Sequence, residues 1–272
     1  MSARPLREPM TSEHFRYALA VQYAGGEFSG WQRQPNVPTV QGALEQAAAK
    51  LTDEPITLQV AGRTDAGVHA TGQIASFSSS LKPEARNWQR GLNALTPASI
   101  YVSWVHSVPV EFHPRYDATS RRYTYIFYDQ QQTDPFISGL AWCCSPLDAD
   151  VMHQQAQCLL GEHDFSSFRG AGCQSLTPMR RVDQVLVRRQ GAFVVMEIEA
   201  NAFLLHMVRN IASGLLNVGL GAADSYLADL LAARDRTALG VTAPPQGLYL
   251  SQVRYPHAGL PAVTALPPIL RA

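Results

Sequence analysis

The loop bracketed by Gly62 and Gly67 is the sequence feature that most limits the possible folds and functions of this chain. It presents one acid and one base directly after a predicted strand. Residues 56–60 alternate between apolar and polar side chains, which predicts a half-buried strand leading into the loop. The two glycines let the chain turn sharply or let a ligand approach the backbone. Arg63 and Asp65 lie two residues apart, so in an extended chain they are on the same side and can form an ion pair.

Asp65 has two interpretations. An arginine partner keeps a carboxylate ionised when a ligand displaces water, and a nucleophile or general base needs that form. An aspartate near glycines at the end of a strand is otherwise a turn residue that hydrogen-bonds its own backbone. Other kinds of site are disfavoured. Val68-His69 stands where a phosphate loop needs Lys followed by Ser or Thr, and a lone carboxylate is a poor calcium site.

The overall charge gives no indication of a nucleic-acid partner. The 272 residues carry 22 Lys and Arg against 22 Asp and Glu, so an RNA-binding function depends on local patches. This length suffices for one large domain or two halves. The four cysteines contain no CxxC pair, which favours a reduced cytoplasm and disfavours a metal site. We expect no signal peptide, because residues 1–14 are polar and contain no apolar core. We expect no membrane span, because the sequence contains no apolar run long enough to cross a bilayer.

The first half of the chain predicts half of a ferredoxin-like unit. Residues 15–23 alternate as a strand, and a glycine-rich loop follows in which Trp31 is either a stacking face for a nucleic acid or an ordinary buried side chain. Thr39 can cap a helix whose inner face carries apolar residues at helical spacing. After the strand and the Asp65 loop come a strand at 73–77, a helix at 84–93 and a strand at 100–105.

The second half predicts the same order of elements, which indicates a duplicated architecture. Its expected elements are a strand at 120–128, a helix from Asp148, strands at 182–188 and 193–200, a helix at 203–218 and a strand at 247–255. The Pro-rich segment from Pro256 is expected to be loosely held.

Three features of this half bear on binding. Arginines beside the aromatic residues of 120–128 suit stacked bases and phosphates, although a core strand with a solvated arginine edge is the other interpretation. The window 169–189 contains five arginines and one acid, the local patch that an RNA-binding function needs. The helix at 203–218 carries a polar stripe, which we expect to line a cleft: His206, Asn210, Ser213 and Asn217.

Six blocks in order resemble the bacterial tRNA pseudouridine synthase A family and cover residues 15 to 255. They are Gly30-Trp31-Gln32-Arg33-Gln34, Gly62 to Ala70, Phe112-His113-Pro114-Arg115, Arg121 to Tyr125, Gly161 to Phe165, and Phe203 to Ile211. The resemblance implies an α+β pseudouridine synthase fold, in which two ferredoxin-like halves form a continuous, mostly antiparallel sheet with helices packed on it and a central active-site cleft. We place the first half, with the catalytic loop, at 15–110 and the second half, with the tRNA-contacting segments, at 111–255. A disordered tail is expected at 1–14 and a Pro-rich tail at 256–272.

The resemblance also implies an activity. A cytoplasmic homodimer would isomerise uridines 38, 39 and 40 of the tRNA anticodon stem-loop to pseudouridine, without cofactor or metal. Asp65 resembles the catalytic aspartate, Arg209 its basic partner, Tyr123 the tyrosine that packs against the target base, and Arg63 the arginine that assists base flipping. Two segments resemble those that contact tRNA: Phe112, His113, Pro114, Arg115 and Tyr116, and Cys173, Gln174, Ser175, Leu176 and Thr177.

Two other functions use the same residues. A nucleotide N-glycosidase would also employ Asp65 at an anomeric carbon, but it needs a second carboxylate as acid or base. A non-catalytic RNA-binding protein explains the arginines and aromatics of 120–128, but it does not explain the acid and base of the glycine-bracketed loop.

Overall fold

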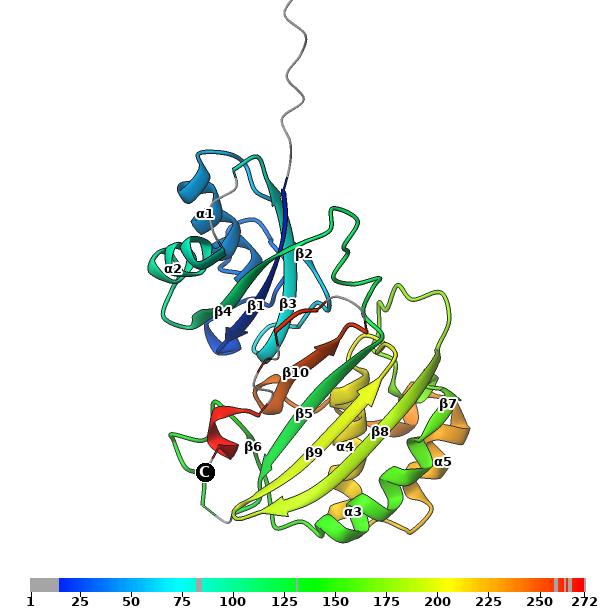
Figure 1. Cartoon of the computed structure of the whole chain (residues 1–272). Helices are drawn as coiled ribbons and strands as arrows, with labels where there is room; N and C mark the ends of the chain where they lie inside the picture. Colours follow the sequence, from blue (N-terminus) through cyan, green and yellow to red (C-terminus); the bar gives the residue numbers. More distant parts are fainter. Residues whose placement is uncertain are drawn as a thin grey trace, which may run out of the picture.

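The same order of elements, strand, helix, strand, strand, helix, strand, occurs twice along the chain (Figure 1). The structure is a computed structural model that describes residues 15–81, 85–130, 132–256, 259–261, 263 and 266–271. The first run, here the first half, comprises β1 (Phe15–Tyr23), α1 (Val40–Thr52), β2 (Gln59–Val60), β3 (His69–Ser79), α2 (Ala85–Leu95) and β4 (Ile100–Val108).

The second run, here the second half, carries three additional elements. Its main elements are β5 (Ser120–Tyr128), α3 (Ala149–Ala156), β8 (Met179–Gln190), β9 (Phe193–Ala200), α4 (Met207–Gly219) and β10 (Leu248–Arg254). The additional ones are β6 (Trp142–Cys143), β7 (Gly161–Asp164) and α5 (Tyr226–Ala233).

All described strands belong to one sheet. Along its main path the order is β4-β1-β3-β10-β5-β9-β8-β7, while β2 pairs with β3 and β6 with β5. Each half therefore has its fourth strand beside its first, then its third and its second, which is the ferredoxin-like order. Among the described pairs only β3–β10 and β5–β6 are parallel. The predicted α+β fold with a continuous, mostly antiparallel sheet is confirmed.

Helices cover one face of the sheet, and the main core lies between the two layers. α1 begins after Thr39, whose hydroxyl oxygen accepts a hydrogen bond from the amide of Gly42. Its residues Val40 and Leu44 are fully buried, whereas Leu51 near its end is 38% exposed. In the second half α3 and α4 pack on the sheet, α5 packs on α3 and α4, and α4 lies behind the strands in Figure 1.

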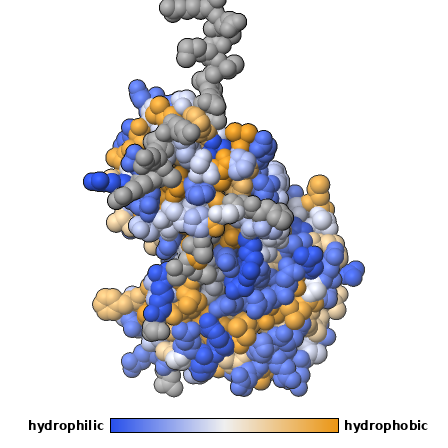
Figure 2. Space-filling view, viewed as in Figure 1, coloured by the Kyte–Doolittle hydropathy of each residue, from blue (hydrophilic) through white to orange (hydrophobic). Residues whose placement is uncertain are grey.

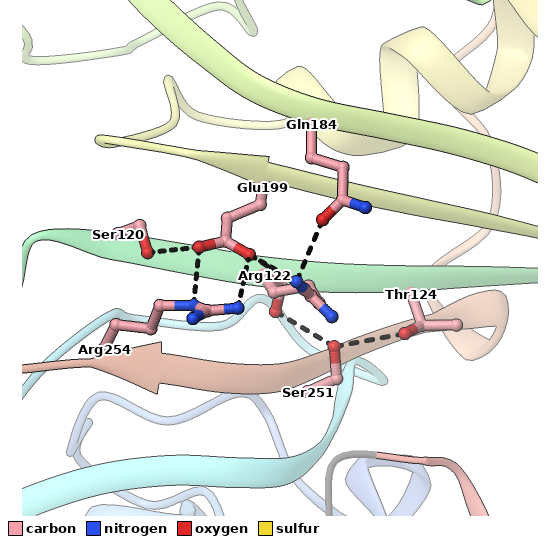
Figure 3. Close-up of polar contacts among 7 residues, drawn as sticks. All are labelled: Ser120, Arg122, Thr124, Gln184, Glu199, Ser251 and Arg254. Atoms are coloured by element: carbon pink, nitrogen blue, oxygen red, sulfur yellow. Dashed lines mark hydrogen bonds and ion pairs between the residues drawn. The ribbon is translucent and has the colours of Figure 1, made fainter.

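On the face of the sheet opposite α3 and α4, Glu199 joins three neighbouring strands of the second half (Figure 3). Its carboxylate lies 2.6 Å from Arg122 Nη2 and 2.7 Å from Arg254 Nε, and it accepts a 2.6 Å hydrogen bond from the hydroxyl of Ser120. Burial raises the pKa of Glu199, but these partners outweigh burial and lower it below its ordinary value. Arg122 is thus an internal ion-pair partner. Figure 2 shows hydrophilic residues across this part of the second half, with hydrophobic ones scattered among them.

The two tails expected at the ends of the chain are described only in part. The expected disordered tail, residues 1–14, lies outside the described residues. In the Pro-rich tail, which we expected to be loosely held, Ile269 and Leu270 pack against the second half. Leu270 is 2% exposed in a cluster with Ile126 and Val195, and its carbonyl oxygen accepts a hydrogen bond from Gln190.

His69 ties the two halves together where β3 meets β10. Its Nδ1 accepts a 3.0 Å hydrogen bond from the amide of Gly25, and its Nε2 lies 3.1 Å from the carbonyl oxygen of Gly139. The ring also stacks on Tyr249 with centroids 4.7 Å apart. Because Nδ1 must accept, the proton is on Nε2 and the ring is neutral. Burial lowers the pKa of His69.

We expect the free energy of unfolding to decrease as the pH falls below about 6.5, the ordinary pKa of histidine. The unfolded chain then takes up a proton that folded His69 resists, at a cost of up to about 1.4 kcal/mol per pH unit, whereas above this pH both states are neutral. Urea unfolding at pH 5.5 and 7.5 measures the effect. His69→Gln should reduce the difference between the two pH values, and exposed His106→Gln should leave it unchanged. An equal difference in all three proteins would contradict the assignment to His69.

Candidate active site

A cleft of about 870 Å³ lies between the two halves. Residues 58–65 line it from the first half, and residues 173–175 and 202–209 line it from the second. Among the described residues of this lining, Asp65 is the only carboxylate, and it faces five arginines: Arg63, Arg115, Arg121, Arg180 and Arg209. A chain with no net charge therefore concentrates a formal charge of +4 in one concave surface, which attracts polyanions.

The Asp65 loop is built against the glycine-rich loop that follows β1. The amide of Trp31 donates a 3.0 Å hydrogen bond to the carbonyl oxygen of Thr64, and the hydroxyls of Tyr23 and Thr64 are 2.7 Å apart. Gly30 has a φ of +92°, and a Cβ there would lie 2.8 Å from the same carbonyl oxygen. The glycine therefore serves a close approach of two backbones.

Trp31 is not a stacking face for a nucleic acid. Its side chain is fully buried, and its ring lies 5.9 Å from that of Tyr23 in the core of the first half. The buried interpretation of this residue is the correct one.

Asp65 is paired across the cleft rather than within its own loop. Its Oδ2 lies 3.2 Å from Arg209 Nη1 and 3.3 Å from His206 Nε2. Arg209 is itself fixed, because its Nε donates a 2.7 Å hydrogen bond to the carbonyl oxygen of Ala243. The pairing of Arg63 with Asp65 expected from their spacing is wrong, since Arg63 is exposed and lines the cleft separately. Arg209 was named only through the family resemblance.

Tyr123 lies on β5 at the inner wall of the cleft. It is 9% exposed, and its ring meets that of Phe203 edge to face, with centroids 5.0 Å apart. Burial raises the pKa of Tyr123 well above its ordinary value, so the hydroxyl is neutral. The ring thus presents an apolar surface beside Asp65.

Arg121 holds the two walls of the cleft together. Its guanidinium donates to the carbonyl oxygen of Ala61 in the first half at 3.1 Å and to that of Asn201 in the second at 3.0 Å. The side chain is only 9% exposed. The interpretation of 120–128 as a strand with a solvated arginine edge therefore does not hold for Arg121 or Arg122. Both side chains donate hydrogen bonds to other groups of the protein.

The two segments expected to contact RNA divide between the cleft and its surroundings. Six of their residues line it: His113, Arg115, Tyr116, Cys173, Gln174 and Ser175. Phe112 and Pro114 are buried instead, and Phe112 packs on Tyr255. Leu176 and Thr177 are exposed and lie outside the lining.

The basic window 169–189 is not a single patch. Three of its arginines are neutralised by acids, Arg181 by Asp183 at 2.6 Å, Arg188 by Glu197 at 2.9 Å and Arg189 by Asp129 at 2.7 Å. The remaining two hold the loop at 173–177: Arg169 donates to the carbonyl oxygens of Cys173 and Ser175, and Arg180 to the hydroxyl of Ser175. Two of the acids come from outside the window, so its net charge misled the sequence interpretation.

The polar stripe of α4 also serves two purposes. Asn210 is fully buried and donates to the carbonyl oxygen of Phe168, and Ser213 donates to that of Val241. These two residues anchor neighbouring segments, so the expectation that the whole stripe lines a cleft is wrong. Of the stripe, His206 alone reaches the cleft.

The described part of the chain contains neither a metal-binding cluster nor a membrane-spanning helix. No group of three or more His, Cys, Asp or Glu side chains is arranged to hold a metal ion. No described helix is long and apolar enough to cross a membrane.

Comparison with known proteins gives matches over most of the chain. The model of a family described as tRNA pseudouridine synthase matches residues 19–117 and 155–256. A relative from Klebsiella pneumoniae (strain 342), named tRNA pseudouridine synthase A, is 48% identical over 252 residues, which are 92% of this chain and 93% of the relative. A relative of the same name from Yersinia pseudotuberculosis serotype O:1b (strain IP 31758) is 48% identical over 91% of this chain and 95% of its own. Another, from Escherichia coli (strain SMS-3-5 / SECEC), is 48% identical over 89% and 90%.

The contact between the two loops predicts the effect of one methyl group. Gly30→Ala should lower the free energy of unfolding by about 2 kcal/mol or more, because φ is positive and the new Cβ meets the carbonyl oxygen of Thr64. Gly26→Ala is the matched control in the same loop, since a Cβ there meets nothing within 4 Å, and it should change stability by less than about 0.5 kcal/mol. Urea unfolding of both variants measures this, and equal losses would show that the close approach is unimportant.

Proposed function

Because this chain belongs to the tRNA pseudouridine synthase family, we propose that it isomerises uridine to pseudouridine in tRNA, at positions 38, 39 and 40 of the anticodon stem-loop. The positions follow from the resemblance of the six sequence blocks. The observation that carries the proposal is Asp65, held by Arg209 in an arginine-lined cleft beside the ring of Tyr123. We propose Asp65 as the catalytic nucleophile or base.

The isomerisation of uridine to pseudouridine requires few catalytic groups. The reaction breaks the bond between N1 and C1′, turns the base and joins C5 to C1′. C5 loses a proton and N1 gains one, so no electrons leave and no group is transferred. One ionised carboxylate is enough to assist, because the uracil ring is first the leaving group and then the attacking group.

The environment of Asp65 supports this role. The positive charge of Arg209, 3.2 Å from Oδ2, offsets the negative charge of the carboxylate when the substrate displaces water. Both described partners of the carboxylate contact Oδ2, so Oδ1 remains available to the substrate. An aspartate that only formed a turn would not need a guanidinium from a helix of the other half.

The substrate base must leave its stack before it reaches Asp65. Extruding a nucleotide costs a few kcal/mol, and stacking on an aromatic ring returns about 1–3 kcal/mol. We propose that Tyr123 packs against the extruded base, and that the exposed side chain of Arg63 occupies the space that the base vacates. The segments at 112–116 and 173–177 contact the RNA backbone through those residues that line the cleft.

The two alternatives receive less support. A glycosidase needs a second carboxylate, and none of the described residues of the cleft lining besides Asp65 is acidic. An RNA-binding protein without activity gains nothing from a carboxylate in its phosphate track, because it repels the phosphates.

The partners and location follow the same proposal. We propose a homodimer in the cytoplasm, on the basis of the family resemblance. All four cysteines are free, which agrees with a reducing compartment. Sedimentation at working concentration that shows only a 29.8 kDa species would contradict the dimer.

Asp65→Asn should lower the single-turnover rate at least about a thousandfold, or about 4 kcal/mol in barrier. The amide keeps the shape but loses the negative charge and most of the nucleophilicity. Folding and RNA affinity should change little, because phosphate contacts dominate binding. The rate is measured with saturating enzyme on an anticodon stem-loop tritiated at C5 of uridine, alongside filter binding of the same RNA. Substantial pseudouridine from the variant would refute catalysis by Asp65. Loss of affinity in step with rate would make the residue structural.

Arg115→Ala should weaken tRNA binding and lower the slope of log affinity against log salt by about one. Arg115 is an exposed cation of the cleft whose guanidinium lies over the ring of Tyr116 at 5.8 Å, so its loss disturbs little else. Arg181→Ala is the matched control, because Arg181 is exposed, paired with Asp183 and outside the cleft lining. Filter binding between 50 and 200 mM salt, roughly the range over which phosphate contacts are resolved, measures both. If Arg181→Ala lowered the slope more than Arg115→Ala, the RNA would follow the basic window instead of the cleft.

A further inference from the structure

We propose that His206, seated against Gly170, is a positioning residue that fixes the orientation of the Asp65 carboxylate. This inference rests on the catalytic role proposed above for Asp65. It assigns a role to a side chain that the reaction chemistry itself does not require.

The first observation is the shape of the contact. His206 Nε2 lies 3.3 Å from Asp65 Oδ2, and Arg209 Nη1 lies 3.2 Å from the same oxygen. The two residues are three apart at the start of α4, so they reach Asp65 from the same side. A single arginine leaves a carboxylate free to turn about its Cβ–Cγ bond. A second partner on the same oxygen restricts that rotation and keeps Oδ1 directed at the substrate.

The second observation is the backbone of His206. Its φ of 60° and ψ of 2° are left-handed, a conformation that glycine adopts freely and that other residues rarely adopt. The side chain does not cap α4, although it stands at the N-cap position. If the backbone turn were the only requirement, glycine or asparagine would meet it at lower cost. The imidazole is therefore kept for another reason.

The third observation is the space left for the ring. A Cβ on Gly170 would lie 2.9 Å from Nδ1 of His206 and 3.0 Å from its Cγ. The amide of Gly170 also donates a 2.8 Å hydrogen bond to the carbonyl oxygen of Leu205, which holds the two segments together. The absence of a side chain at Gly170 lets the ring stand between this loop and Asp65.

Two substitutions at His206 separate the side-chain contact from the backbone turn. His206→Gln places an amide nitrogen where Nε2 was, but glutamine tolerates the left-handed backbone poorly. His206→Asn suits that backbone, but its shorter amide corresponds to Nδ1 and does not reach Asp65. A positioning contact predicts that the Gln variant is faster than the Asn variant, and a purely structural turn predicts the reverse.

The measurement is the single-turnover rate with saturating enzyme on the C5-tritiated stem-loop, with filter binding of the same RNA. We expect His206→Asn to lose roughly 10- to 100-fold in rate, the usual effect of misplacing a catalytic group, with affinity unchanged within about twofold. His206→Gln should recover most of the loss. If the Asn variant is as fast as the Gln variant or faster, or if affinity falls in step with rate, the proposal is refuted.

Gly170→Ala tests the same device from the other side. In the wild-type background it should slow turnover, because its Cβ displaces the ring of His206. In the His206→Asn background it should add much less, since the Nε2 contact is already lost and the two effects are not additive. Independent, additive losses would contradict the coupling.

Asp65→Asn, measured in parallel, separates this inference from the function on which it rests. If Asp65→Asn turns over at the wild-type rate, the proposed function fails and the inference with it. If Asp65→Asn is inactive while His206→Asn keeps the wild-type rate, the function stands and only the positioning role is refuted.

Discussion

The cleft exists because the two halves of the sheet pair over only two residues. β3 and β10 run parallel through His69 opposite Tyr249 and Ala70 opposite Leu250. Further along, the same edge of β3 pairs with β2, at Ala75 and Ser76, instead of with β10. At the point of divergence Gly72 lies so close to β10 that a Cβ would be 2.1 Å from the carbonyl oxygen of Ser251. Val68 and Leu248, the residues that directly precede this short pairing, line the cleft.

This arrangement makes the site a joint product of both halves. The first half supplies Asp65 on a loop fixed by neighbouring backbone, and the second supplies Arg209, His206 and Tyr123. Because the arginines of both walls face a single carboxylate, the field of the cleft is strongly positive although the chain as a whole is neutral. An anionic substrate is therefore drawn to the cleft that contains Asp65.

Local patterns predicted the elements well, and non-local contacts explain most of the errors. The strand at 15–23 and the Thr39 cap need only period and side-chain chemistry, and both were predicted at their observed positions. The spacing of Arg63 and Asp65 suggested an ion pair, but a helix from the other half supplies the arginine instead. In the basic window, Asp129 and Glu197 neutralise two of the arginines, and both acids lie outside the residues whose charges were counted. The sequence did not predict that His206 contacts Asp65, because the left-handed backbone of His206 leaves no signature in residue spacing.

The separation of Asp65 and Arg209, 144 residues along the chain, has a consequence for how the protein matures. Contacts between distant residues form late in folding, because the entropy of closing a long loop must be overcome before they contribute. The strands and helices of the first half are near one another in sequence, and they can build the Asp65 loop on Tyr23 and Trp31 early. Arg209 and His206 reach the carboxylate only when the two halves have come together. A newly made chain therefore lacks a complete site at Asp65 until its second half has folded against the first.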